Sequence, residues 1–447
     1  MTLVLRNVRP WGGDAVDVAL ADGRISAIGA GLPRAHDEID GRGDLLLPGL
    51  HDHHLHILAL AARRQSVDLT GLCAAAAVRA ALAGAVRVGG WLRAVGYDER
   101  AAGLPDAAVL DQWVGACPLR LQDRTGALWV LNSSGLAHLA GRDLPPGAER
   151  DSSGRPTGRF WREDQWLAGA LPRSLPDLAG MGQDLARLGL TGLTDATAHN
   201  GPVEARLLAG AVPQRLTLMG GEALTVGQGY TRGPLKLLID ERDPPDPDAL
   251  AARIDVARAQ GRNVAAHCVT EVELALYLAA LGAGGARAGD RIEHGGMIPH
   301  QAVAVIAEAG LTVVTNPAFI HDRGDRYRAT IAPDDWVDLY RARSLIAAGI
   351  PLMAGSDAPY AAVDPWLGMR AARDRLTAGG TLLAVEERIG ALTALRLYAD
   401  RPLVRGAPAD LMLCAGSLGD VLSDLSADRV KATFVAGMPV FSGATFL

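Results

Sequence analysis

Scarcity of cysteine, of lysine and of long apolar runs narrows what this chain of 447 residues can be. Its four cysteines lie far apart and without CxxC spacing, which favours reduced thiols in the cytoplasm over a disulfide framework. No run approaches about 18 apolar residues, and no basic stretch followed by an apolar one opens the chain, so we expect neither a membrane span nor a secretory signal. A formal net charge of -6 gives no electrostatic reason to expect nucleic acid or an anionic membrane as a partner.

Lysine is so rare that each instance needs a reason. Of the 44 lysine and arginine residues, only two are lysines, Lys236 and Lys431. Lys236 lies within the apolar run PLKLLI, where a charged ammonium would be costly to bury without a partner. Because arginine stands in place of lysine almost everywhere else in the chain, Lys236 indicates that its position needs a chemical property that a guanidinium lacks.

Short apolar runs alternate with amphipathic helical patterns over most of the chain, as a parallel sheet requires. Eight such runs are present: residues 44–52, 189–197, 213–220, 233–240, 262–268, 291–295, 311–317 and 351–357. This pattern predicts an α/β fold, a (β/α)8 barrel of the TIM type. In such barrels the chemistry takes place at the C-terminal ends of the strands.

Strand patterns at both chain ends predict a second, smaller part of the fold. Residues 1–44 contain two alternating runs separated by Asp22-Gly23, a strong hairpin signal, and residues 403–447 contain another strand-turn-strand pattern. We therefore expect the two ends to pair in one composite sheet domain beside a barrel over residues 45–402.

The gap between the first two barrel strands is too long for one crossover, so residues about 66–185 are expected to form an insertion. It contains five of the eight tryptophans: Trp91, Trp113, Trp129, Trp161 and Trp166. These residues form either the insertion's own core or an apolar lid over the barrel mouth.

Four of the eleven histidines fall within the stretch HDHHLH at the end of the first predicted barrel strand. Side chains alternate along a strand, so His54 and His56 share a face with Asp52, while His51 and His53 face the other side. An HxH pair at the C-terminal end of the first barrel strand can supply two imidazoles to one metal ion.

Four of the other apolar runs each contain a residue that can bind a metal ion, directly or after chemical modification. These residues are Lys236, His267, His294 and Asp357. Each has a structural alternative, because a strand-end histidine is commonly hydrogen-bonded, Asp357 could cap the next helix, and Lys236 could belong to an ion pair. Because each lies where barrel chemistry is expected, the combination favours a metal site.

These motifs resemble those of the metal-dependent amidohydrolase superfamily, in particular its branch of N-acyl and formamide-type hydrolases with a long insertion after strand one. PGLHDHHLH is similar to the family's PGxxDxHxH, and GPLKLLID to its fourth-strand lysine segment. AAHC, RIEHG and GSDAP resemble the segments that carry the ligands of strands five, six and eight, and DSSGRPTG and GLTGLTD resemble signatures of that branch. The resemblance covers nearly the whole chain. It implies an amidohydrolase-type barrel with a small β-sandwich built from residues 1–44 and 403–447.

The resemblance also implies two divalent metal ions, with zinc as the expected metal. His54, His56 and Asp357 would bind the more buried ion, and His267 and His294 the outer one. A bridging water would become hydroxide near neutral pH, and the outer ion would polarise the scissile carbonyl. Asp357 would accept the proton of that water and pass it to the leaving nitrogen.

Lys236 would bridge the two ions after its side-chain nitrogen has been carboxylated by carbon dioxide. This role accounts for the choice of lysine, because a guanidinium stays protonated and cannot form a carbamate, whereas a desolvated amine can become neutral.

The chain departs from its relatives at three places on the substrate side. Ala127 stands where relatives often have histidine, Thr197-Ala198 where many have a His-Asp pair, and Thr270-Glu271 where many have Gly-Asp. These departures leave the metal ligands intact. Because they lie on the substrate side, the substrate specificity of those relatives is not transferred to this chain.

Three arginines, Arg323, Arg326 and Arg328, follow the seventh predicted strand. They form either a bidentate contact to a substrate carboxylate or a solvated charged loop.

The function expected is hydrolysis of a non-peptide C–N bond, in an amide, a formamide or a cyclic amide, of a small-molecule substrate in the cytoplasm. One alternative is deamination of a heterocyclic amine, against which Lys236 argues because deaminases of this superfamily commonly use one metal and no bridging lysine. Another is a metal-free relative that acts in binding or assembly, but such proteins usually lose ligands and none is missing here. A homo-oligomer is compatible with the sequence.

Overall fold

The computed structural model describes residues 2–172, 175–282, 285–399 and 401–443. The chain divides into two compact units: Met1–Ile57 together with Leu178–Leu447, and Leu58–Asp177. The first unit contains an eight-stranded parallel barrel and a sheet built from both chain ends, and the second contains a separate mixed sheet. No helix within the described ranges is both long and apolar enough to cross a membrane.

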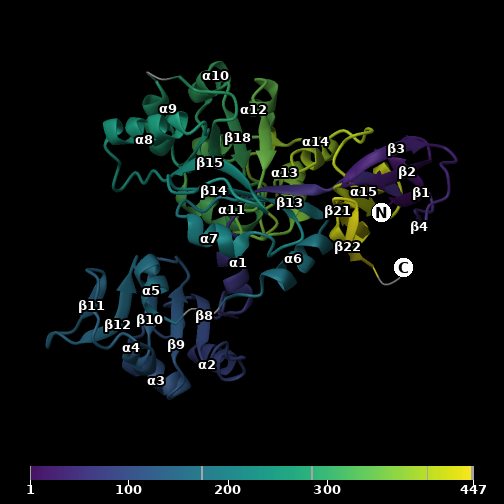
Figure 1. The fold of residues 1–447 in the computed structure, drawn as a ribbon. Helices are drawn as coiled ribbons and strands as arrows, with labels where there is room; N and C mark the ends of the chain where they lie inside the picture. The colour runs from purple at the N-terminus through teal and green to yellow at the C-terminus, as the bar shows by residue number, and fades with distance from the viewer. Residues whose placement is uncertain (1, 173–174, 283–284, 400, 444–447) are drawn as a thin grey trace. The chain divides into compact units, whose positions relative to one another are not determined.

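Eight parallel strands form a nearly closed barrel, which confirms the predicted fold class (Figure 1). In sheet order they are β6 (Leu50–Leu55), β13 (Leu190–Asp195), β14 (Arg215–Gly220), β15 (Thr231–Leu237), β16 (Val264–Cys268), β17 (Arg291–His294), β18 (Thr312–Thr315) and β19 (Leu352–Ala354). The first and last strands meet at their C-terminal ends, where Asp357 N donates to His54 O at 2.7 Å and His56 N donates to Ala358 O at 2.8 Å.

Helices surround these strands. They are α6 (Leu178–Arg187), α7 (Pro202–Leu208), α8 (Pro247–Ala259), α9 (Glu271–Leu281), α10 (His300–Glu308), α11 (Ala318–Thr330), α12 (Arg343–Ala347), α13 (Pro365–Asp374) and α14 (Ala391–Arg396). Leu235, Leu237 and Ala266 pack with apolar residues of α8, α9 and α10 in one buried cluster. Because side chains alternate along a strand, Lys236 and His267 project to the opposite side, into the barrel.

The run of residues 44–52, predicted as one barrel strand, consists of two strands separated by Gly49. β5 (Leu45–Pro48) pairs with β1 (Thr2–Pro10) and β20 (Leu411–Cys414) of the terminal sheet, and the barrel strand begins at Leu50. A Cβ at Gly49 would lie 2.1 Å from Cγ2 of Thr191, so only glycine permits the close approach of these strands.

Strands from both ends of the chain share one sheet, in the order β22-β21-β20-β5-β1-β2-β3, with β4 paired to β1. They are β1 (Thr2–Pro10), β2 (Val16–Ala21), β3 (Arg24–Gly29), β4 (Asp37–Asp40), β5, β20 (Leu411–Cys414), β21 (Val430–Val435) and β22 (Met438–Ser442), with α15 (Leu418–Asp424) between β20 and β21. The expected hairpin turn is present between β2 and β3, where Asp22 and Gly23 have φ values of 51° and 73°.

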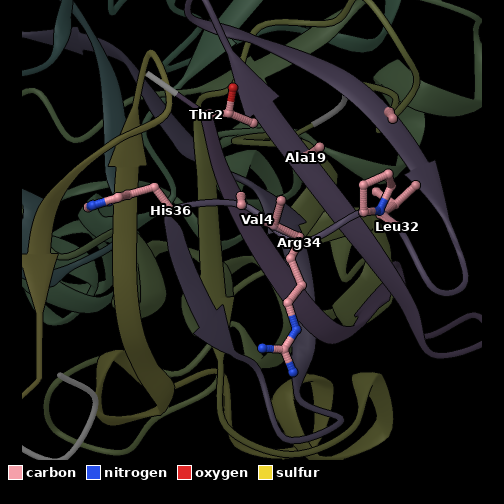
Figure 2. A pocket seen from close by; sticks show the side chains of 9 residues that line it. Thr2, Val4, Ala19, Leu32, Arg34 and His36 are labelled. Atoms are coloured by element: carbon pink, nitrogen blue, oxygen red, sulfur yellow. The ribbon is translucent and has the colours of Figure 1, made fainter.

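A pocket of about 470 Å³ lies on this terminal sheet (Figure 2). Thr2, Val4 and Ala19 contribute from β1 and β2, and Leu32 and His36 from the segment between β3 and β4. None of the candidate metal ligands lines it.

The second unit contains a six-stranded sheet in the order β11-β12-β10-β9-β8-β7. Its elements are α1 (Ile57–Arg64), which begins at the end of the first unit, β7 (Val67–Asp68), α2 (Ala75–Ala83), β8 (Leu92–Tyr97), α3 (Ala107–Val114), β9 (Leu119–Asp123), β10 (Leu128–Leu131), α4 (Ser133–Ala137), β11 (Ala148–Arg150), β12 (Pro156–Trp161) and α5 (Asp164–Ala170). Trp91, Trp113, Trp129 and Trp166 pack into the unit's two apolar clusters, whereas Trp161 is exposed. The interpretation of the tryptophans as core residues therefore holds for four of the five.

Candidate metal centre

Three candidate ligands meet where the first and last barrel strands end. His54, His56 and Asp357 each offer a ligand atom within 4.8 Å of the others. Nε2 of His56 lies 3.1 Å and Nε2 of His54 lies 3.4 Å from Oδ1 of Asp357. His54 and Asp357 are buried and His56 is half-buried, so the group is open to solvent on the side of His56.

His294 and His267 lie beside this group. The ring of His294 is 4.5 Å from that of His54 and 4.6 Å from that of His267, measured between centroids. Its Nδ1 is 4.0 Å from Oδ2 of Asp357. Burial, together with the charge of Lys236, lowers the pKa of His267 to about 4, so its imidazole is neutral at pH 7 as a metal ligand must be.

The side chain of Lys236 lies close enough to these histidines to lower their pKa values by its charge. Its Nζ is buried and has no hydrogen-bond acceptor among the described residues. Burial lowers the pKa of the amine, although Glu293 and Asp357 oppose that shift. The unpaired cation is unfavourable as it stands, which argues against the structural ion-pair alternative.

The orientation of His54 is fixed by a buried ion pair that the sequence reasoning missed. Nδ1 of His54 hydrogen-bonds Oε2 of Glu293, which also accepts from Arg291, with Arg291 Nε lying 2.6 Å from Oε1. Arg291 in turn donates to the carbonyl oxygen of His53 at 2.8 Å. Because a carboxylate accepts, the proton of His54 resides on Nδ1 and Nε2 is directed toward Asp357.

Two further polar residues orient the other imidazoles. Asn316 Nδ2 donates to Gly355 O at 2.9 Å, which identifies its Oδ1 as the acceptor 2.8 Å from Nδ1 of His294. Oγ1 of Thr197 lies 3.0 Å from Nδ1 of His56. Metal-binding histidines commonly use the second ring nitrogen in this way.

The arrangement suits a divalent cation. Nε2 of His54 has no hydrogen-bond partner among the described residues, yet it lies 3.4 Å from a carboxylate oxygen. Burial disfavours the charged form of Asp357, but the facing imidazoles of His294, His54 and His56 hold its pKa well below the usual range. An ion between these nitrogen and oxygen lone pairs would satisfy both, and imidazole and carboxylate are ligands that zinc accepts.

Backbone geometry holds the ligands in place at a conformational cost. His294 and Asp357 have φ values of 72° and 57°, in the left-handed region that residues other than glycine seldom occupy. Oδ1 of Asp52 accepts from the backbone N–H groups of His54 (3.1 Å) and Ser356 (3.0 Å). Asp52 therefore ties the first strand to the segment after the last.

Other residues singled out in the sequence lie elsewhere. His51 and His53 stack on each other with ring centroids 4.2 Å apart, and Nε2 of His51 lies 2.8 Å from Oγ1 of Thr194. Thr270 caps α9 by accepting from Glu273 N at 3.3 Å.

The expectation that residues 323–328 form a loop is wrong, because they lie within the helix α11. One face of α11 buries Phe319, Ile320 and Gly324, and this packing outweighs the charged, weakly helical local pattern. Arg323 donates to the carbonyl oxygen of Tyr360 at 2.9 Å, and Arg328 to that of Leu382 at 3.0 Å.

Sequence reasoning overlooked Glu293, Arg291 and Asn316, and it missed the role of Thr197. The stretch RIEH offered a signal, since two charged residues within a four-residue strand between apolar runs must find partners if the strand is buried. Thr197 was noted only as a departure from relatives, and its contact to His56 joins two distant segments.

One family sequence model and one curated relative each match most of this chain. The sequence model of the Amidohydrolase family matches residues 37–441. The putative amidohydrolase YtcJ of Bacillus subtilis (strain 168) is 23% identical over 470 residues, which cover 92% of this chain and 86% of YtcJ.

Among solved structures, an uncharacterized metal-dependent hydrolase from Pyrococcus horikoshii OT3 matches with a TM-score of 0.79 and 17% identity, over 94% of this chain and 98% of that one. N-isopropylammelide isopropylaminohydrolase from Burkholderia multivorans ATCC 17616 matches with a TM-score of 0.55 and 16% identity, over 98% of each chain.

Proposed function

The chain belongs to the amidohydrolase family, and from this premise we propose that it hydrolyses a non-peptide C–N bond, in an amide, a formamide or a cyclic amide, of a small molecule. The observation that carries the proposal is the convergence of His54, His56 and Asp357 at the C-terminal edge of the barrel. That edge is where barrel enzymes carry out their chemistry.

Two divalent ions, zinc in our proposal, would be held by the residues described above. His54, His56 and Asp357 would hold one ion, and His267 and His294 the other. When bound, such ions activate water and polarise a carbonyl group as Lewis acids. Among divalent metals zinc suits this set best, because its donor atoms are imidazole nitrogens and carboxylate oxygens.

Lys236 would complete the site as a carbamate. Its neutral amine would add carbon dioxide, so that an N–C bond forms, one proton is released, and an anionic carbamate replaces a neutral amine. The lowered pKa of the buried amine supports this step, because only the neutral form is nucleophilic. The carbamate group would then add two oxygen ligands to Nζ, which has no hydrogen-bond partner among the described residues.

Asp357 is assigned to proton transfer. Its Oδ1 is contacted by the two imidazoles of the HxH pair, and its carboxyl group is ionised at neutral pH because of the histidines that face it. Oδ2 would accept a proton from the attacking water and deliver it to the leaving nitrogen. Glu293 and Thr197 would keep the histidines oriented while the proton moves.

The test is turnover of a substrate panel by the full chain, stripped with a chelator and then reconstituted with zinc. The panel contains an N-acyl amino acid, an N-formyl amine, a hydantoin and a heterocyclic amine. We expect hydrolysis of an amide class by the reconstituted chain only. We also expect its loss in His56→Ala but not in His36→Ala, a control whose histidine is 94% exposed.

Turnover of the heterocyclic amine alone would favour the deaminase alternative. Full turnover after removal of metal would overturn the proposal. The four free cysteines support a cytoplasmic location, which stays a prediction, as does a homo-oligomer.

A further inference from the structure

Two arginines and a tryptophan form an unusual group on the sheet of the second unit. Arg93 lies on β8, Arg120 on β9 and Trp129 on β10, three neighbouring strands (Figure 1). Residues that alternate with them, such as Leu92 and Leu119, pack on the other face with α2 and α3. The three side chains therefore share one face of this sheet.

The two guanidiniums are neighbours of like charge. Arg93 and Arg120 occupy paired positions of the parallel strands β8 and β9. Both lie over the ring of Trp129, with Cζ 5.0 Å and 4.3 Å from its centroid. Burial and the charge of Arg120 lower the pKa of Arg93 to about 9. Like charges at paired positions destabilise a sheet, so this arrangement needs a compensating reason.

No carboxylate of the described residues forms an ion pair with either arginine. Arg93 donates to Ser66 Oγ and, at 3.3 Å, to Ala62 O, but its Nε is buried without an acceptor. The side chain of Arg120 has no hydrogen bond within the described part of the chain, and its Nε is likewise buried. Stacking on an indole stabilises a guanidinium but leaves its N–H groups unsatisfied.

The charges in the neighbourhood leave one positive charge uncompensated. Asp164 attracts both guanidiniums but accepts its hydrogen bond from Nε1 of Trp129, at 2.5 Å. Arg63 is paired with Asp68 at 3.3 Å. Two arginines and one aspartate thus sum to +1, which a monovalent anion neutralises and a phosphate dianion exceeds.

We propose that Arg93 and Arg120 bind the carboxylate of a small molecule on the second unit. The ring of Trp129 covers one face of each guanidinium, and Ser66 and Ala62 accept from Nη1 of Arg93. The remaining N–H groups of Arg93 and those of Arg120 are left at the edges for hydrogen bonds in the guanidinium plane. Arginine recognises carboxylates through such edges. This inference does not depend on the hydrolysis proposed above.

The experiment uses benzoate as a monovalent carboxylate probe on the full chain, at constant ionic strength set with chloride. Modification of individual arginines by phenylglyoxal is followed by mass spectrometry of peptides, with and without benzoate. We expect benzoate to slow modification of Arg93 and Arg120 by about tenfold and to leave Arg79, exposed on α2, unchanged. Because this readout uses the unaltered chain, it does not depend on the folding of a variant.

Calorimetric titration of benzoate into three variants gives the second readout. Arg93→Gln and Arg120→Gln should each weaken binding by about tenfold, and the control Arg79→Gln should bind as the wild type does. Equal modification with and without benzoate, or unchanged affinity in Arg120→Gln, would overturn the proposal. Stronger protection by inorganic phosphate than by benzoate would overturn the assignment to carboxylate.

Discussion

Replacing Glu293 with glutamine separates the carboxylate's charge from its shape. The carboxylate accepts from Nδ1 of His54 and, at 2.6 Å, from Nε of Arg291, and all three side chains are buried. A glutamine has only one oxygen acceptor, and its NH2 group would oppose the second donor. If the amide oxygen stays with Arg291, His54 loses its anchor, and if it stays with His54, Arg291 loses a hydrogen bond. In either orientation the buried guanidinium loses its counter-charge.

Both outcomes have an expected size. Loss of a hydrogen-bonding partner behind a metal ligand typically lowers metal affinity by about 10–100-fold. Removal of one member of a buried ion pair costs about 3–5 kcal/mol of unfolding free energy. We therefore expect Glu293→Gln to bind zinc about tenfold more weakly, or more so, and to unfold at lower denaturant concentration.

Two assays measure these quantities: competition for zinc with a chromophoric chelator, and unfolding in urea of the metal-free chain at pH 7. Glu308→Gln is the matched control, because Glu308 is exposed at the end of α10. A Glu293→Gln chain with wild-type zinc affinity, and with a free energy of unfolding within about 0.5 kcal/mol of the control, would refute the assigned role of the carboxylate.

Three further predictions concern single residues. Asp357→Asn should lower turnover by about 10²–10⁴-fold; metal content is measured alongside, and near-native turnover of a fully metallated variant would remove Asp357 from the mechanism. Lys236→Ala and Lys236→Arg should both lose the metal pair, and formate with excess zinc should restore some activity to the alanine variant only; an arginine variant active without added acid would show that Lys236 serves as a cation. Burial lowers the pKa of His51 from 6.5 to about 3. As the pH falls, the imidazole of His51 is therefore protonated in the unfolded chain before it is protonated in the folded chain. The free energy of unfolding is not lowered by His51 above pH 6.5. As the pH falls from 6.5 toward 3, protonation of His51 in the unfolded chain lowers it by up to about 1.4 kcal/mol per pH unit. Urea unfolding of His51→Asn should show a shallower loss over this pH range, and an unchanged slope would contradict the assignment.

Residues whose role follows from their own strand were accessible from the sequence. His267 ends a short apolar run and His294 ends another, and a parallel sheet brings such ends to one edge. Alternation along β6 placed His54 and His56 near each other, as the structure has them. Lys236 stood out by composition alone.

Contacts between distant segments were not accessible in the same way. The break at Gly49 depends on Thr191, which approaches from a strand far along the chain. Arg291 and Glu293 are two positions apart on one strand, but their relation to His54 exists only after the barrel has closed. The helical state of Arg323 depends on the burial of one face of α11, because tertiary packing outweighs local propensity there.

The most direct test of the metal-dependent mechanism is the metal content of the chain. Purified protein is stripped, dialysed against zinc in the presence of bicarbonate, and analysed by plasma mass spectrometry beside His54→Ala and the control His36→Ala. We predict two zinc ions per chain for the wild type and the control, and loss of the metal pair in His54→Ala. A wild-type chain that binds no metal, or a His54→Ala chain that retains both ions, would contradict the assignment of this barrel edge as a metal centre.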